Sequence, residues 1–150
     1  RKNGAKTMSS AFSDYLEYTV LRQTMKQTDS GNLVATAIWL GLHQTNLTDT
    51  AGTSGTEVST TGGYTRFQST AADWTVNTAG TILAKNAGAL SFPINASGSA
   101  YVVTDVGIWR HSSNNLSSDL MFRGTLSASV TVNLNDTFQF AASALTITVS

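Results

Sequence analysis

The chain has 150 residues and contains no cysteine, a single proline and only two histidines. Without cysteine it forms neither disulfides nor thiolate metal sites. Only 12% of its residues are charged, about half the ~25% typical of globular domains. Basic and acidic side chains cancel to a formal charge of zero, so no global field draws the chain to nucleic acid or to an anionic membrane. So low a charge suggests that much of the surface is covered by other protein.

Longer patterns with a known chemistry are also missing. No apolar run approaches the ~20 residues of a membrane span, and the basic N-terminus is not followed by the apolar core of a secretion signal. No histidine pair has metal-ligand spacing, no carboxylate pair suggests glycoside hydrolysis, and no base is set up to activate a serine. We therefore expect a non-enzymatic protein without a cofactor or metal, and without nucleic acid or membrane as a partner.

The stretch 101–110 is the strongest strand signal, because β-branched and aromatic residues fit a pleated, half-buried surface. Alternation places Val102, Val106 and Ile108 on one face, and Val103 and Trp109 on the other. Apolar residues on both faces predict a central strand with neighbours on both edges.

Short alternating segments fill most of the chain around it. We expect strands at 33–43, 64–71, 74–77, 81–85, 89–93, 101–110, 119–126, 129–133, 137–141 and 145–149. Many short strands at regular spacing predict a sandwich or barrel, and the strand number suits a jelly roll. The predicted fold is all-β: a jelly-roll-like antiparallel β-sandwich with one N-terminal α-helix, forming a single domain over 13–150.

The first part of the chain predicts an arm and a helix. Residues 1–12 are polar and basic at Arg1, Lys2 and Lys6, which is typical of a frayed end or of an arm that lies on a neighbouring subunit. From Phe12 to about Met25 an apolar stripe predicts the helix.

Residues 44–63 form a long polar stretch, and loops of this length are usually functional or disordered. Its acids, Asp49 and Glu57, are too few for a calcium loop. We interpret it as a surface or contact loop.

The core is expected from alternation within the strands. The predicted core residues are Ile38, Leu40, Leu42, Phe67, Phe92, Val106, Ile108, Phe122, Phe138, Phe140 and Ile147. The tryptophans Trp39, Trp74 and Trp109 lie within or next to predicted strands, where packing is the expected role. His43, at the end of its strand, is expected to be structural.

Several segments occur in one order that resembles a known family. They are Trp39–His43, Gly55–Val58, Gly62–Arg66, Leu90–Pro93, Val106–Trp109, Leu120–Leu126, Val132–Phe138, Phe140–Ala142 and Leu145–Ile147. The chain resembles small tailed-bacteriophage virion proteins that are called tail fibre-like and that serve, in some phages, as capsid decoration or cement proteins. The similarity covers about 13–150, whereas the basic N-terminus and residues 44–54 depart from it.

The resemblance implies a virion protein assembled in the host cytoplasm. We expect a capsid decoration protein that stabilises the shell, forms a homo-oligomer, specifically a trimer, and contacts the phage major capsid protein; the alternative is a tail fibre-like or receptor-binding module. The capsid or subunit contacts are expected at Arg1, Lys2, Lys6, Asn46, Asp49 and Glu57.

Overall fold

Three β-sheets make up the computed structural model, which describes residues 37–48, 55–77, 83–113 and 119–148 and the backbone of 2–3, 6–7 and 11–12. The large sheet has the strand order β3 (Ala11–Phe12), β10 (Leu120–Val132), β9 (Tyr101–Trp109), β4 (Ile38–His43), β5 (Phe67–Ser69). A second sheet has the order β1 (Lys2–Asn3), β11 (Phe138–Phe140), β8 (Leu90–Ser91). The third has the order β2 (Lys6–Thr7), β12 (Leu145–Thr148), β7 (Leu83–Asn86), β6 (Trp74–Asn77).

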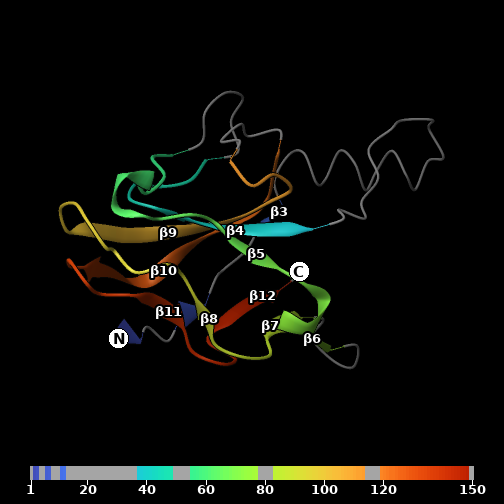
Figure 1. The fold of residues 1–150 in the computed structure, drawn as a ribbon. Coiled ribbons are helices and arrows are strands. Elements are labelled where there is room, and N and C mark those ends of the chain that lie inside the picture. The colour runs from blue at the N-terminus through green and yellow to red at the C-terminus, as the bar shows by residue number, and fades with distance from the viewer. Residues whose placement is uncertain are drawn as a thin grey trace.

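The sheets form layers, with the large sheet on one side of the core and the two smaller sheets on the other (Figure 1). All pairings are antiparallel except those of β1 with β11 and β2 with β12. The helical structure in the described residues includes the short 3-10 turns Thr60–Gly62 and Ala71–Asp73. The all-β prediction is confirmed; the jelly-roll connectivity stays a prediction.

The N-terminal strands pair with this same chain. Lys2 lies opposite Phe138, and Lys6 lies opposite Leu145. Phe12 lies opposite Phe122 in β10, so the prediction that the helix begins at Phe12 is wrong. The rest of the predicted helix lies outside the described residues and stays a prediction.

The long strand β10 replaces two predicted strands. A break was expected at Ser127 and Ala128, but pairing with β9 continues to Val132. The register shifts between Thr125, which lies opposite Asp105, and Val130, which lies opposite Val103. This part of β10 therefore contains extra residues relative to β9, and the strand continues beyond them.

Because of this irregular stretch of β10, the side chains of β9 do not alternate strictly between the two faces of the sheet. Val102 is 40% exposed, whereas Val103 is wholly buried in the same core cluster as Val106 and Ile108. The predicted placement of Val102 with Val106 is therefore wrong. Strict alternation is lost because the partner strand is irregular opposite this part of β9.

Aromatic residues from separate segments form the centre of the core. The centroid of the Phe92 ring lies 5.8 Å from the ring centroid of Phe138, 6.0 Å from that of Phe67 and 6.2 Å from that of Tyr64. The predicted core is confirmed: eight of its residues are buried in this cluster, and Ile38, Phe67 and Phe122 pack partly buried against it.

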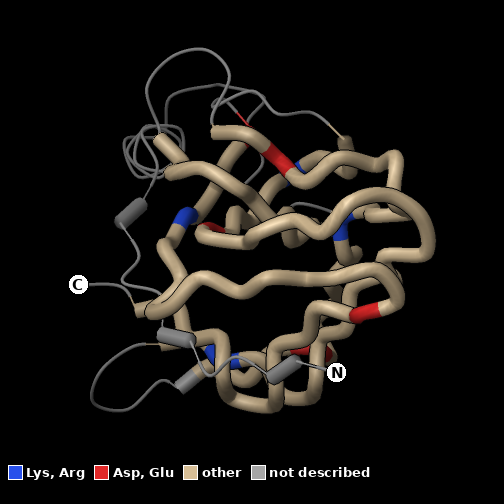
Figure 2. The backbone as a smooth tube through the Cα atoms, turned by 90° about the vertical axis from the view of Figure 1, so that its left-hand side faces the viewer, with Lys and Arg blue, Asp and Glu red and all other residues tan. Residues whose placement is uncertain are grey.

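Charged residues are scattered over the described chain without a patch of one sign (Figure 2). Within the described ranges, no helix is long and apolar enough to cross a membrane.

Candidate functional site

The outer face of the large sheet, turned away from the core, contains a slot made by two glycines. Gly41 of β4 lies directly opposite Gly107 of β9, so both leave the same face without side chains. A Cβ atom on Gly107 would lie 2.5 Å from Nε1 of Trp109, and one on Gly41 would lie 3.0 Å from the same atom. The indole therefore lies against bare backbone, and Trp109 is fully buried although it is outside the main core cluster.

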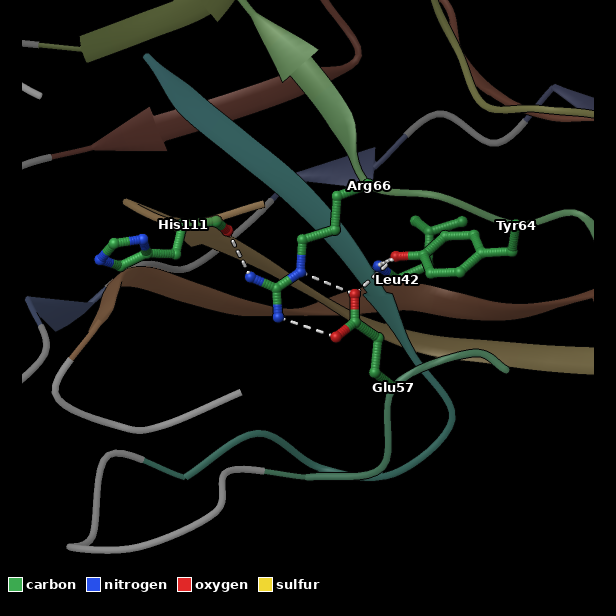
Figure 3. Close-up of polar contacts among 5 residues, drawn as sticks. All are labelled: Leu42, Glu57, Tyr64, Arg66 and His111. Atoms are coloured by element: carbon green, nitrogen blue, oxygen red, sulfur yellow. Dashed lines mark hydrogen bonds and ion pairs between the residues drawn. The ribbon is translucent and has the colours of Figure 1, made fainter. Parts of the chain in front are cut away.

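Figure 3 shows an ion pair between the buried Arg66 and the partly exposed Glu57. The pair covers the slot, since a Cβ atom on Gly41 would lie 3.0 Å from Oε1 of Glu57 and 3.2 Å from Nε of Arg66. Arg66 donates from Nε to Oε1 of Glu57 and from Nη2 to Oε2, each at 2.8 Å. The Tyr64 hydroxyl donates to Oε1 of Glu57 at 2.9 Å and accepts from the Leu42 amide at 2.8 Å. Arg66 also donates from Nη1 to the His111 carbonyl at 2.7 Å. Charge-assisted bidentate bonds hold a fixed geometry, so the network joins β4, the segment before β5 and the loop after β9.

His43 lies on the same face and is fully buried. Its ring stacks on Trp109 with centroids 5.6 Å apart, and the Arg66 guanidinium carbon lies 4.3 Å from the Trp109 ring centroid. Burial lowers the pKa of His43 to about 4; Arg66 also lowers it, while Glu57 and Asp105 raise it by less than burial lowers it. The imidazole is therefore neutral at neutral pH.

One loop closes over the indole from outside; we call residues 44–48 and 55–57 the covering loop. Leu47 is buried in a small cluster with Trp109 and Leu120. The Gln44 amide donates to the Thr56 carbonyl at 2.8 Å. Leu47 and Glu57 pack against the sheet, while Thr45, Asn46 and Thr56 are exposed. The interpretation of 44–63 as a surface or contact loop stays a prediction.

The chemistry of this cluster indicates a structural role, in which it holds separate segments of the chain together. Both oxygens of Glu57 are engaged, and burial, followed by the charge of Glu57, raises the pKa of the Tyr64 hydroxyl. In the ranges that the structure describes, no group of three or more His, Asp or Glu residues is placed to hold a metal ion. The arrangement therefore fixes loops on a sheet.

The predicted contact residues do not come together at this cluster. Asn46 is exposed on the covering loop, whereas Glu57 is within the network with its side chain 17% exposed. Lys2 and Lys6 are placed by their backbones in β1 and β2. Arg1 and Asp49 lie outside the described residues. A contact role for these six residues stays a prediction.

Sequence reasoning missed the network but found the segments that carry it. Glu57, Arg66 and Trp109 each belong to a separate segment of the family resemblance. The sequence did carry a signal for this cluster. Glu57 and Arg66 each lie in a short segment that also contains glycine, and Trp109 follows Gly107 by two residues. Those segments meet because β4 pairs with β9 and the covering loop folds back over both.

Comparison with known proteins identifies the class and then the family. A family model described as podophage GP4 fiber I protein gp80 matches residues 11–148. No curated protein matches the chain. The chain is thus a virion protein of a tailed phage, as the resemblance predicted. It belongs to the family of the podophage GP4 fiber I protein gp80.

Proposed function

We propose that this chain is a non-enzymatic fibre module of a tailed-phage virion, located at the tail and contacting the host surface. The observation that carries the proposal is the family match, which spans residues 11–148 and names a fibre protein. The buried network supports a structural role, since its hydrogen bonds join segments of the chain. The family match favours this alternative over the capsid decoration role that the sequence suggested first.

The proposed assembly is a homotrimer built in the host cytoplasm, each copy having jelly-roll connectivity and the N-terminal helix. The low charge of the chain supports assembly, because uncharged surface is suited to cover by other protein. The absence of cysteine is consistent with folding in a reducing compartment. The major capsid protein is a partner only in the decoration alternative.

Electron microscopy of intact particles tests the location. Antibody fragments raised against the purified domain should label the tail. Labelling spread over the capsid shell would overturn the fibre proposal and support the decoration role.

Competition for host cells tests the contact with the host surface. Purified protein in excess should slow adsorption of the phage, and an Asn46→Arg variant should compete less if the covering loop makes the contact. Ala128→Arg is the matched control, because Ala128 is also exposed but lies on β10. Unchanged adsorption with folded wild-type protein would contradict the host-contact role.

A further inference from the structure

The first two strands of the chain lie along its last two. Strand β1 pairs with β11, where Asn3 lies opposite Gln139, and β2 pairs with β12, where Thr7 lies opposite Thr146. Both pairings are parallel. The beginning of the chain therefore follows residues 138–146 in one direction, in two short ladders separated by the turn in which the Ala144 amide donates to the Ala141 carbonyl.

Both strands occupy an edge of their sheet. Strand β1 is the outermost strand beside β11, and β2 is the outermost strand beside β12. The backbone groups along the edge of a sheet are a template on which another extended segment can pair. Such pairing is made by main-chain hydrogen bonds, so the edges of β11 and β12 accept this segment equally well from the same chain and from another copy.

The family comparison separates these two strands from the rest of the fold. The family model matches residues 11–148, which include β3, β11 and β12, whereas β1 and β2 precede the match. The edges that accept the segment therefore belong to the family fold, and the segment that pairs with them lies outside the matched part.

Charge divides the chain at the same place. Residues 1–10 contain three basic residues and no acidic one, whereas residues 11–150 contain six basic and nine acidic residues. The formal charges of the two parts are thus plus three and minus three. Opposite charges steer association, so the beginning of one copy is attracted to the remainder of a neighbouring copy as well as to its own.

We propose that β1 and β2 of one copy pair with β11 and β12 of a neighbouring copy, so that strand exchange links the copies of the fibre. The inference rests on the homo-oligomeric assembly given under the proposed function. The hinge is residues 8–10, since β3 stays on β10 of its own copy; a short hinge of this kind favours exchange. Each copy then gives one segment and accepts one, a head-to-tail contact that closes as a ring in a trimer.

Cysteine cross-linking tests the exchange in the full chain, which has no cysteine of its own. Chains with Asn3→Cys are co-expressed with chains with Gln139→Cys, and the purified protein is oxidised. The two positions lie opposite each other in the parallel register, so the exchanged segment brings the two thiols close enough to react. We expect a disulfide that joins one chain of each kind, identified by mass spectrometry of the linked peptides. Thr7→Cys with Thr146→Cys is the second pair and should behave in the same way.

Ala128→Cys is the matched control for Gln139→Cys, because Ala128 is exposed but lies on β10. It should give little or no disulfide with Asn3→Cys. A chain that carries both Asn3→Cys and Gln139→Cys reports pairing within one copy. Disulfides that form only within such double-variant chains would overturn the proposal. Equal cross-linking to Ala128→Cys, or no disulfide in either arrangement, would also overturn it.

Deleting residues 1–7 provides an independent measurement, because it removes β1 and β2 and leaves the part that matches the family. In sedimentation at micromolar concentration, the oligomer should be lost and a monomer should remain. An oligomer of unchanged size would overturn the proposal. Neither experiment depends on where the protein lies in the virion. Labelling of the capsid shell would therefore overturn the fibre role and leave strand exchange between copies intact.

Discussion

The glycine at position 107 leads to the sharpest test of the packing on the outer face. In Gly107→Ala, the new methyl group would lie 2.5 Å from Nε1 and 3.0 Å from Cε2 of Trp109, and 3.1 Å from Cδ1 of Leu120. The indole is enclosed by His43 and by the Arg66 guanidinium, so it has little freedom to move away. Overpacking of this kind typically costs about 1–3 kcal/mol. We expect the upper end of that range.

Thermal and urea unfolding measure this loss. For a chain of this length each kcal/mol corresponds to about 2–4 °C, so the melting temperature should fall by about 6–12 °C. Gly88→Ala is the control, since a Cβ atom there meets nothing within 4 Å; its stability should be unchanged or slightly raised. The melting temperature of the Gly41→Ala protein should lie between those of the Gly107→Ala and Gly88→Ala proteins, because the nearest atoms to a Cβ atom on Gly41 are 3.0 Å away.

A double-mutant cycle assigns the loss to the indole. In a Trp109→Leu background, Gly107→Ala should destabilise much less than in the wild-type protein, because the closest contact is gone. Equal stability of the Gly107→Ala and Gly88→Ala proteins, or an unchanged cost in the Trp109→Leu background, would refute the reasoning.

Four further predictions concern the core, the ion pair, the oligomer and the arm. Phe138→Ala should lower the free energy of unfolding by about 3–5 kcal/mol, because Phe138 is 1% exposed in the aromatic cluster; an unchanged melting temperature would contradict this. Glu57→Gln leaves the Arg66 cation buried and should cost the lower end of ~3–5 kcal/mol, and adding Arg66→Met should restore part of it. Sedimentation should show a trimer, and a stable monomer at micromolar concentration would argue against it. Deleting residues 1–10 should reduce the amount of protein on purified particles more at low salt than at high salt, since exposed ion pairs are screened at high salt; equal occupancy with and without the arm would contradict a contact role for it.

Local patterns in the sequence were enough for the β class and for the core. Phe138 and Phe140 alternate with polar residues, and a period of two assigns them to one face without knowledge of their partners. The same logic found Leu40, Leu42 and Ile108. It failed at Val103, because an irregularity in another strand decided which face of β9 was buried there.

The arrangement of residues on the outer face of the large sheet depends on contacts between segments that are distant in the sequence, and the sequence alone does not reveal these contacts. Gly41 and Gly107 are unremarkable separately; the pairing of β4 with β9 sets them opposite each other and makes room for Trp109. Glu57, in a stretch that reads as a polar loop, becomes the partner of Arg66 because the covering loop folds back over the sheet. The sequence by itself determined which residues are apolar, that most of the chain is β, and which phage family the chain resembles. Only the tertiary structure decided which charges are buried together, because burial and pairing depend on which segments the fold brings into contact.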